Sequence, residues 1–283
     1  MRARSVTSRK LTNLTVTIIA GSAAVLGLFM LSWILITIAA RGFEAINWQF
    51  FTDLPSPPGS SGGGLSNAIV GTIMITILAT AIGVPIGILA GIYLAEFGHE
   101  SKFANAVRFV ANILMGAPSI VIGVFVYTLV VVPMSGFSGL AGSIALAIIM
   151  LPIVTRTTED MLKLVPNSLR ESALALGAPE HKMIFQIIFR AAKSGLITGV
   201  ILAVARVSGE TAPLLFTTLN SPYWSLSMAK PMGNLTVTIF NYAMSPYADW
   251  QAKAWGASLL ITAGVLLMTL TARFLVKDRR ARR

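Results

Sequence analysis

The stretch GLITGVILAVARVSGETAPLLF (residues 195–216) places two charged side chains, Arg206 and Glu210, inside an otherwise apolar segment. If a helix enters a membrane near Gly195, Arg206 lies roughly 16 Å deep at 1.5 Å per residue, near the middle of a ~30 Å hydrocarbon core. An arginine keeps its charge in proteins, so at that depth it needs an anion, water or a bundle interior. The pair therefore indicates either a structural bridge or a functional site in a membrane.

The same stretch contains residues that interrupt a helix. Arg206 and Glu210 are four positions apart, which places them on one helix face. Pro213 lacks an N–H, which leaves the carbonyl of Gly209 without its helical donor. Charges beside a broken helix are typical of membrane transport sites. Two interpretations stay open: a bridge that holds the helix, or a guanidinium that binds a tetrahedral oxyanion through paired hydrogen bonds.

The composition indicates a polytopic, all-α membrane protein. Of the 283 residues, 55% are hydrophobic and 12% are charged, whereas a soluble domain carries about 25% charged residues. PMSGFSG (133–139) is a turn-like cluster that divides one long apolar run. Cysteine is absent and the two histidines, His99 and His181, lie far apart, so no metal site is predicted. The apolar runs predict six transmembrane helices at 14–40, 67–95, 110–132, 140–156, 195–217 and 254–275.

The positive charges predict the orientation. Most of the 22 Lys and Arg residues lie in the N-terminal tail 1–13, the 96–109 and 156–194 loops and the basic tail 276–283, so both termini are expected in the cytoplasm. The six-helix permease domain then covers 14–275. The net charge of +11 follows from this topology, and the basic tail suits a membrane surface better than nucleic acid. The first apolar run is too long for a cleavable signal peptide.

Two segments are expected on the opposite, external side. PSPPGSSGGG (55–64) is predicted to be a flexible stretch before the second helix. The long loop 219–253 is rich in tryptophan and tyrosine. These aromatic residues suit either an interfacial belt or a docking surface for an external partner.

The loop 166–194 is predicted to form two short helices joined at an angle. Ser168 and Glu171 have the S-x-x-E spacing of a capping box. Gly177 suits the end of the first short helix, and Pro179 suits the first turn of the next one.

This segment resembles the EAA loop of ABC-importer permeases, through Glu171, Ala173, Gly177 and Ile187. The resemblance implies a coupling helix, about 168–177, that lies in a groove of a cytoplasmic ATPase; the alternative is an ordinary amphipathic helix at the membrane surface. The chain has no G-x-x-x-x-G-K-[ST] motif. It is therefore expected not to be an enzyme, and another subunit would hydrolyse ATP.

The chain is further similar to the PstA-like permeases of the phosphate-specific ABC importer. The similarity lies in ARVSGETAPLLFT (205–217), GGGLSNAIVGT (62–72), GIYLAEFG (91–98), GAPSIVIGVFVYTLVV (116–131), LPIVTRTTEDMLKLVPNSLRESALALG (151–177) and NLTVTIFNYAMSP (234–246). It implies a type I importer membrane domain, MetI-like in fold, in the bacterial inner membrane.

The same resemblance implies partners and site residues. The partners are a second, PstC-like permease, a PstB-like ATPase homodimer that holds ATP and Mg, and an external PstS-like phosphate-binding protein; no cofactor binds this chain. Arg206, Glu210, Thr211 and Arg156 are assigned to the substrate path, and of these the resemblance implicates the two arginines. For Arg156, at the expected cytoplasmic end of a helix, a simple membrane-anchoring role is equally compatible with the sequence.

The expected function is inward phosphate transport by alternating access. Glu210 could accept a hydrogen bond from the P–OH that phosphate keeps near neutral pH, whereas sulfate has no such proton. The alternatives are a permease for another oxyanion (sulfate, molybdate or phosphonate) and an ion-coupled secondary transporter. Inverted repeats would favour the latter, and the sequence shows no convincing repeat. A role in reporting phosphate status stays open.

Overall fold

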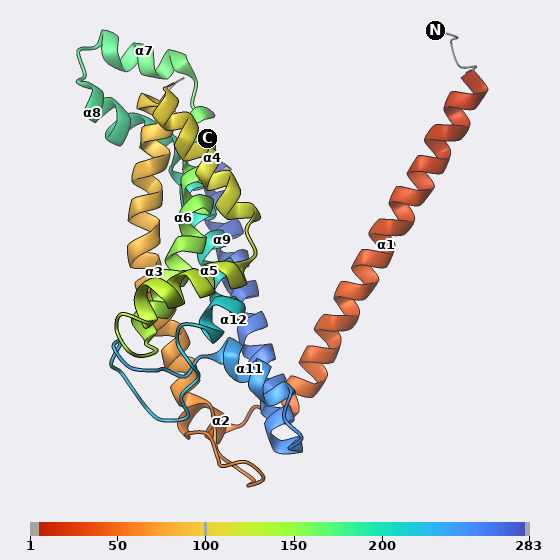
Figure 1. The fold of residues 1–283 in the computed structure, drawn as a ribbon. Helices are drawn as coiled ribbons and strands as arrows, with labels where there is room; N and C mark the ends of the chain where they lie inside the picture. The colour runs from red at the N-terminus through yellow and green to blue at the C-terminus, as the bar shows by residue number, and fades with distance from the viewer. Residues whose placement is uncertain (1–5, 99–100, 281–283) are drawn as a thin grey trace.

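The computed structural model describes residues 6–98 and 101–280, and these form an all-helical chain (Figure 1). Among the described residues, five helical segments are long and apolar enough to cross a membrane, and a sixth span results if one bent helix pair is counted. The fold class predicted from the sequence is therefore confirmed. The α-helices are α1 (Val6–Ala45), α2 (Trp48–Thr52), α3 (Ser66–Ile92), α4 (Lys102–Gly116), α5 (Ser119–Val126), α6 (Gly139–Lys163), α7 (Asn167–Ala175), α8 (Glu180–Lys182), α9 (Phe189–Ser208), α10 (Ala212–Leu215), α11 (Leu235–Ala243) and α12 (Ala248–Arg280). Three π-helical turns, η1 (Tyr93–Phe97), η2 (Tyr127–Val131) and η3 (Met183–Ile188), continue α3 and α5 and lead into α9.

The helices form an elongated bundle whose two ends differ (Figure 1). The short helices α7 and α8 lie at one end, called here the α7 end, and α2 and α11 lie at the other, called the α11 end. The start of α1 and the last turns of α12 both lie toward the α7 end. Residues 1–5 of the predicted tail 1–13 and residues 281–283 of the predicted tail 276–283 lie outside the described residues. The rest of both tails is helical, because α1 begins at Val6 and α12 continues to Arg280.

The helices α3 and α6 pack closely because of a stripe of glycines. Gly83, Gly87 and Gly91 recur every four residues on the face of α3 that meets α6. A Cβ added at Gly87 would lie 2.8 Å from the Cβ of Val154, and one at Gly91 would lie 2.5 Å from the Cβ of Thr158. Small residues at this spacing let two membrane helices approach closely, so this pair forms the centre of the main apolar core.

The predicted third span, 110–132, is not a single helix. The helices α4 and α5 meet at an angle of 106°. Ala117 between them is extended, with φ −71° and ψ 137°, because the ring of Pro118 disfavours the helical conformation in the residue before it. The predicted turn at 133–139 is confirmed, since Ser138 caps α6 by accepting a hydrogen bond from the amide of Ala141.

Several helices extend beyond their predicted ends. The fourth predicted span ends at 156, but α6 continues to Lys163. The fifth was predicted over 195–217, whereas the helical segment Glu180–Ser208 starts earlier and stops before Gly209. The helix α1 diverges from the bundle toward the α7 end (Figure 1), and no residue of its most apolar window is buried. Its close contact with the bundle lies at Gly42, beside Trp255 and Leu259 of α12.

Candidate functional site

The candidate site lies where α9 is interrupted. The helix ends at Ser208, Gly209 is its C-cap, and α10 begins at Ala212 with Pro213 in its first turn. The break predicted from Gly209 and Pro213 is therefore present. It is held in place by α11, since the hydroxyl of buried Thr236 donates to the backbone carbonyl of Glu210 at 2.9 Å.

The break changes the relation between the two charged residues. Because the helix stops at Ser208, Glu210 is not one turn further along the same helix face, and the prediction of a shared face is wrong. Within the part of the chain that the structure describes, Arg206 and Glu210 form no ion pair with each other or with a third residue. A structural bridge between them is thus absent from this conformation.

Both residues nevertheless line one small pocket of about 100 Å³. The bent α4–α5 pair supplies one wall and α6 supplies the other, through Leu114, Met115, Ala117, Ser119, Ile122, Ile149 and Ile153. The side chain of Arg206 is exposed and Glu210 is half-buried. Thr211, assigned to the same path, is half-buried at the start of α10 and does not belong to the pocket wall. Two interrupted spans and a charged pair therefore meet at one place.

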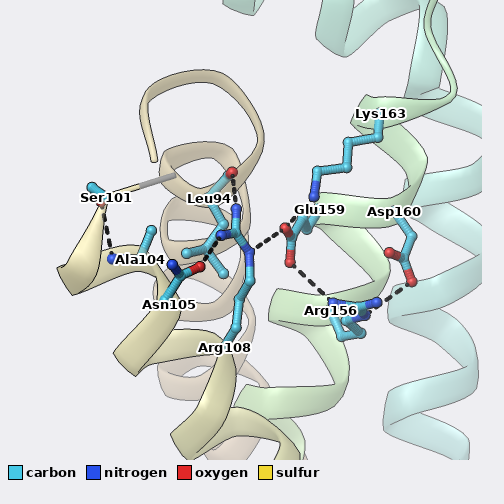
Figure 2. A network of polar contacts seen from close by, with 9 residues as sticks. All are labelled: Leu94, Ser101, Ala104, Asn105, Arg108, Arg156, Glu159, Asp160 and Lys163. Carbon is cyan, nitrogen blue, oxygen red and sulfur yellow. Dashed lines mark hydrogen bonds and ion pairs between the residues drawn. The ribbon is translucent and has the colours of Figure 1, made fainter. Parts of the chain in front are cut away.

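A polar cluster lies on α6 toward the α7 end, and Figure 2 shows its members. Glu159 is fully buried and accepts from three cations: Arg108 Nε at 2.8 Å, Lys163 Nζ at 2.5 Å and Arg156 Nη1 at 3.5 Å. Arg156 also pairs with Asp160 at 3.3 Å and keeps 44% of its side chain exposed. Arg156 is thus paired and lies inside α6, which ends only at Lys163, so the predicted helix end at 156 is wrong.

Arg108 connects this cluster to two other helices. From α4 it donates to Glu159 on α6 and to the backbone carbonyl of Leu94 in η1, the latter at 2.9 Å (Figure 2). The sequence prediction missed Arg108, Glu159 and Lys163. Glu159 falls in the predicted cytoplasmic loop 156–194, and Arg108, which helps to bury it, is 51 residues away in sequence.

The predicted coupling helix exists as α7 (Asn167–Ala175), but it is capped differently from the prediction. The capping box does not form: Pro166 is the N-cap residue, without a side-chain hydrogen bond, and Ser168 lies inside the helix. The end at Gly177 agrees with the prediction. Gly177 has φ +77°, and its amide and that of Ala178 bond back to the carbonyls of Leu174 and Ala173, which is a Schellman motif.

The two faces of α7 differ. Ala173 is buried against a small apolar cluster that includes Ile184 and Ile188 of η3. Ser168, Glu171 and Gly177 are exposed, and Leu176 keeps 88% of its surface exposed. One face thus packs onto the bundle, while the other presents a carboxylate and an apolar side chain at the α7 end.

At the α11 end, the two predicted external segments are more ordered than expected. Lys253 of α12 is buried and donates to the hydroxyl of Ser56 and the carbonyl of Gly62, which fixes the Pro/Gly/Ser-rich stretch. The loop 219–253 contains α11 and the first turns of α12. Tyr242 stacks on Trp250 with ring centroids 4.3 Å apart, and burial raises the pKa of Tyr242 to about 12.

The described part of the chain contains no group of three His, Cys, Asp or Glu residues that could hold a metal ion. Its chemical resources are therefore an unpaired guanidinium and carboxylate in a pocket, a cation-rich cluster nearby, and a short helix exposed at one end.

Comparison with known proteins identifies the class. A family described as binding-protein-dependent transport system inner membrane component matches residues 83–281. A chain of the inward-facing MetNI methionine ABC transporter superposes with a TM-score of 0.64 at 19% identity, covering 76% of this chain and 95% of that one. An amino acid ABC transporter crystallised with histidines gives a TM-score of 0.53, also at 19% identity, over 77% and 92% of the two chains. Fold and match together define a multi-pass inner-membrane permease component of an ABC transporter, which is not itself the ATPase.

Closer relatives identify the family. The phosphate transport system permease protein PstA of Yersinia pestis is 51% identical over 87% of this chain and 84% of its own length. The corresponding protein of Mycobacterium leprae is 34% identical over 96% and 91%, and a protein named as a probable PstA in Methanocaldococcus jannaschii is 36% identical over 92% of both chains. This chain belongs to the PstA family of phosphate transport system permease proteins. Nothing in these matches indicates a cofactor bound by the chain.

Proposed function

We propose that this chain moves inorganic phosphate inward across the membrane, as the permease subunit of an ATP-driven importer working by alternating access. One observation carries the proposal: Arg206, whose guanidinium has no partner among the described residues, lines a pocket with Glu210 where two spans are interrupted. The names of the relatives support phosphate as the substrate.

The chemistry of the pocket suits a single small oxyanion. Its volume of about 100 Å³ is that of roughly three water molecules at ~30 Å³ each. The guanidinium of Arg206 can donate paired hydrogen bonds to two phosphate oxygens. Glu210 would accept a hydrogen bond from the P–OH of phosphate and repel sulfate, which carries no proton near neutral pH. The α5 helix starts at Ser119 in the pocket wall, so its N-terminus adds a partial positive charge.

Arg156 is proposed as the next cation along the path. It lies one helical turn beyond Ile153, a residue of the pocket wall, toward the α7 end of α6. Its half-exposed guanidinium is shared between Glu159 and Asp160, so a passing anion would meet a cation that is already held in position. Thr211 would help to fix the start of α10 rather than contact the anion.

The α7 end is proposed to face the cytoplasm, with both termini on that side. An ABC permease works with an ATPase and a binding protein, and α7 presents Glu171 and Leu176 where a PstB-like ATPase dimer would dock. The ordered segments around Lys253 and α11 would face a PstS-like phosphate-binding protein. The unburied apolar length of α1 would contact lipid and a PstC-like second permease. ATP and Mg would be bound by the ATPase alone.

The test is ATP-driven uptake of labelled phosphate into proteoliposomes that contain this chain with its candidate partners, supplied with external binding protein. Arg206→Gln is compared with Arg190→Gln, which removes an exposed arginine that has no ion-pair partner among the described residues. We expect uptake to need ATP, to resist excess sulfate, to fall at least 100-fold in Arg206→Gln and to be unchanged in Arg190→Gln. The 100-fold loss corresponds to about 2.7 kcal/mol, the order of one charge-assisted contact.

Two results would contradict the proposal in different ways. Uptake that persists in Arg206→Gln would make Arg206 structural and move the site to Arg156 or to the second permease. Transport of another oxyanion in place of phosphate would leave the permease class intact and refute the substrate.

A further inference from the structure

A second arginine, Arg170 on α7, joins the proposed coupling helix to the membrane-spanning helices. Its Nε and Nη2 donate to the two carboxylate oxygens of Glu96 at 3.1 and 2.7 Å. Its remaining donors reach the carbonyls of Val165 and Leu162 at 2.6 and 2.9 Å and the amide oxygen of Asn167 at 3.2 Å. A guanidinium has five N–H donors, and here all five are used.

These partners belong to different structural elements. Glu96 lies in η1, which continues α3, while Leu162 lies in the last turn of α6 and Val165 in the bend that follows it. The carbonyls in the last turn of a helix lack intrahelical donors and carry partial negative charge, so the end of α6 provides a site for a cation. One side chain of α7 therefore holds the ends of both helices that form the core of the bundle.

The contact is buried and geometrically specific. The side chains of Arg170 and Glu96 are 17% and 5% exposed, and hydrogen bonding to Glu96 raises the pKa of Arg170. A paired arginine–carboxylate fork fixes orientation as well as distance. A lysine at this position would keep the charge but could not make the fork.

The position of Arg170 in α7 determines how the Arg170–Glu96 contact can link this helix to the rest of the bundle. Arg170 immediately precedes exposed Glu171, and Ala173, three residues later, packs into the apolar cluster beneath the helix. Without the arginine, α7 would be joined to the bundle by that apolar packing and by its flanking turns at Pro166 and Gly177. With it, a displacement of α7 by a docked ATPase must displace the ends of α3 and α6 as well.

Building on the proposed function, we propose that Arg170 and Glu96 are positioning residues that couple ATP hydrolysis to transport, by transmitting the movement of α7 to α3 and α6. The pair does not contact the substrate or ATP. Its loss should leave docking and hydrolysis without binding protein intact and reduce the number of phosphate ions imported for each ATP hydrolysed.

The experiment measures three quantities in reconstituted complexes: ATP hydrolysis with and without binding protein, phosphate uptake, and assembly by size-exclusion chromatography. The variants are Arg170→Gln, Arg170→Lys, Glu96→Gln and the double variant Glu96→Gln/Arg170→Gln, with Arg190→Gln as the matched control. In Arg170→Gln we expect hydrolysis without binding protein to be unchanged, its stimulation by binding protein to be lost, and phosphate imported per ATP to fall at least tenfold. Arg170→Lys should be intermediate, and the double variant should be no worse than Arg170→Gln because both remove the same contact.

Three outcomes would overturn the proposal. The first is an Arg170→Gln complex that assembles and imports phosphate with the wild-type yield per ATP. The second is a loss of hydrolysis without binding protein in proportion to the loss of uptake, which would indicate weakened docking of the ATPase. The third is failure of both Arg170→Gln and Glu96→Gln to assemble, which would make the pair a requirement for folding alone. Failure of the proposed function itself would instead appear as absence of phosphate uptake in the wild-type complex.

Discussion

Neutralising Glu159 should destabilise the protein far more than neutralising the next residue, Asp160. Both carboxylates pair with Arg156, so the substitutions Glu159→Gln and Asp160→Asn each remove one negative charge beside the same cation. The two sites differ in burial, because the side chain of Glu159 is fully buried and that of Asp160 is 48% exposed. The comparison therefore measures what burial and the two further cations, Arg108 and Lys163, add to an ionic contact.

The expected loss of folding stability depends on which of the paired cations can become solvated when Glu159 is neutralised. Removing one partner of a buried ion pair costs about 3–5 kcal/mol, because an uncompensated charge stays buried. Lys163 and Arg156 are 49% and 44% exposed and can be solvated, whereas Arg108 is only 18% exposed, so we expect the low end, about 3 kcal/mol, for Glu159→Gln. An exposed pair contributes about 0.2–1 kcal/mol, which is the expected effect of Asp160→Asn.

The assay is the midpoint of heat-induced loss of the folded peak in size-exclusion chromatography, in detergent or nanodiscs. With a shift of roughly 2–4 °C for each kcal/mol in a chain of about this size, Glu159→Gln should lower the midpoint by roughly 6–12 °C. Asp160→Asn should lower it by no more than about 2–4 °C, and by less at high salt because exposed charges are screened. Equal shifts for the two variants, or a shift below about 2 °C for Glu159→Gln, would refute the argument that the buried cluster holds α4 and η1 to α6.

Three further outcomes are expected. Glu210→Gln should lower the uptake rate and weaken the preference for phosphate over sulfate, and competition assays in which both quantities keep their wild-type values would exclude the proposed role of Glu210. Gly87→Val should lower the free energy of unfolding by about 1–3 kcal/mol through overpacking, because its Cβ would lie 2.8 Å from that of Val154. Gly27→Val is the control in the same thermal assay, because nothing lies within 4 Å of a Cβ at that position. Equal effects of the two variants would contradict the close packing of α3 on α6. Gly177→Ala should lower the free energy of unfolding by about 1 kcal/mol, since a φ of +77° is unfavourable for a residue with a Cβ. Ser168→Ala should lower it by less than about 0.5 kcal/mol, because the capping box, which would contribute about 1 kcal/mol, does not form. Hydrogen exchange across α7 compares these two variants, and greater fraying in Ser168→Ala would reverse the assignment.

The features predicted correctly from the sequence are those set by local chemistry. Apolar length decides which segments can span a membrane, so the all-helical class and most of the spans followed from composition and charge. The end of the coupling helix at Gly177 and the interruption near Gly209 and Pro213 followed from backbone preferences of single residues. Pro118 also signals the bend at Ala117. Because Pro118 lies inside a long apolar run, the sequence prediction treated the whole run as one helix.

The features decided by tertiary structure are those that join distant residues. Glu159 is buried because Arg108 approaches from 51 positions away, and Arg170 finds Glu96 across 74 positions. Because α4 and α5 meet at a bend, their residues form one wall of the pocket that contains Arg206. Lys253 orders the Pro/Gly/Ser-rich segment 55–64, which the composition of that segment predicts to be flexible. A charge in a sequence shows only that a partner is needed. The close packing of α3 on α6, permitted by three glycines, and the folding of α4 against them determine which partner is within reach.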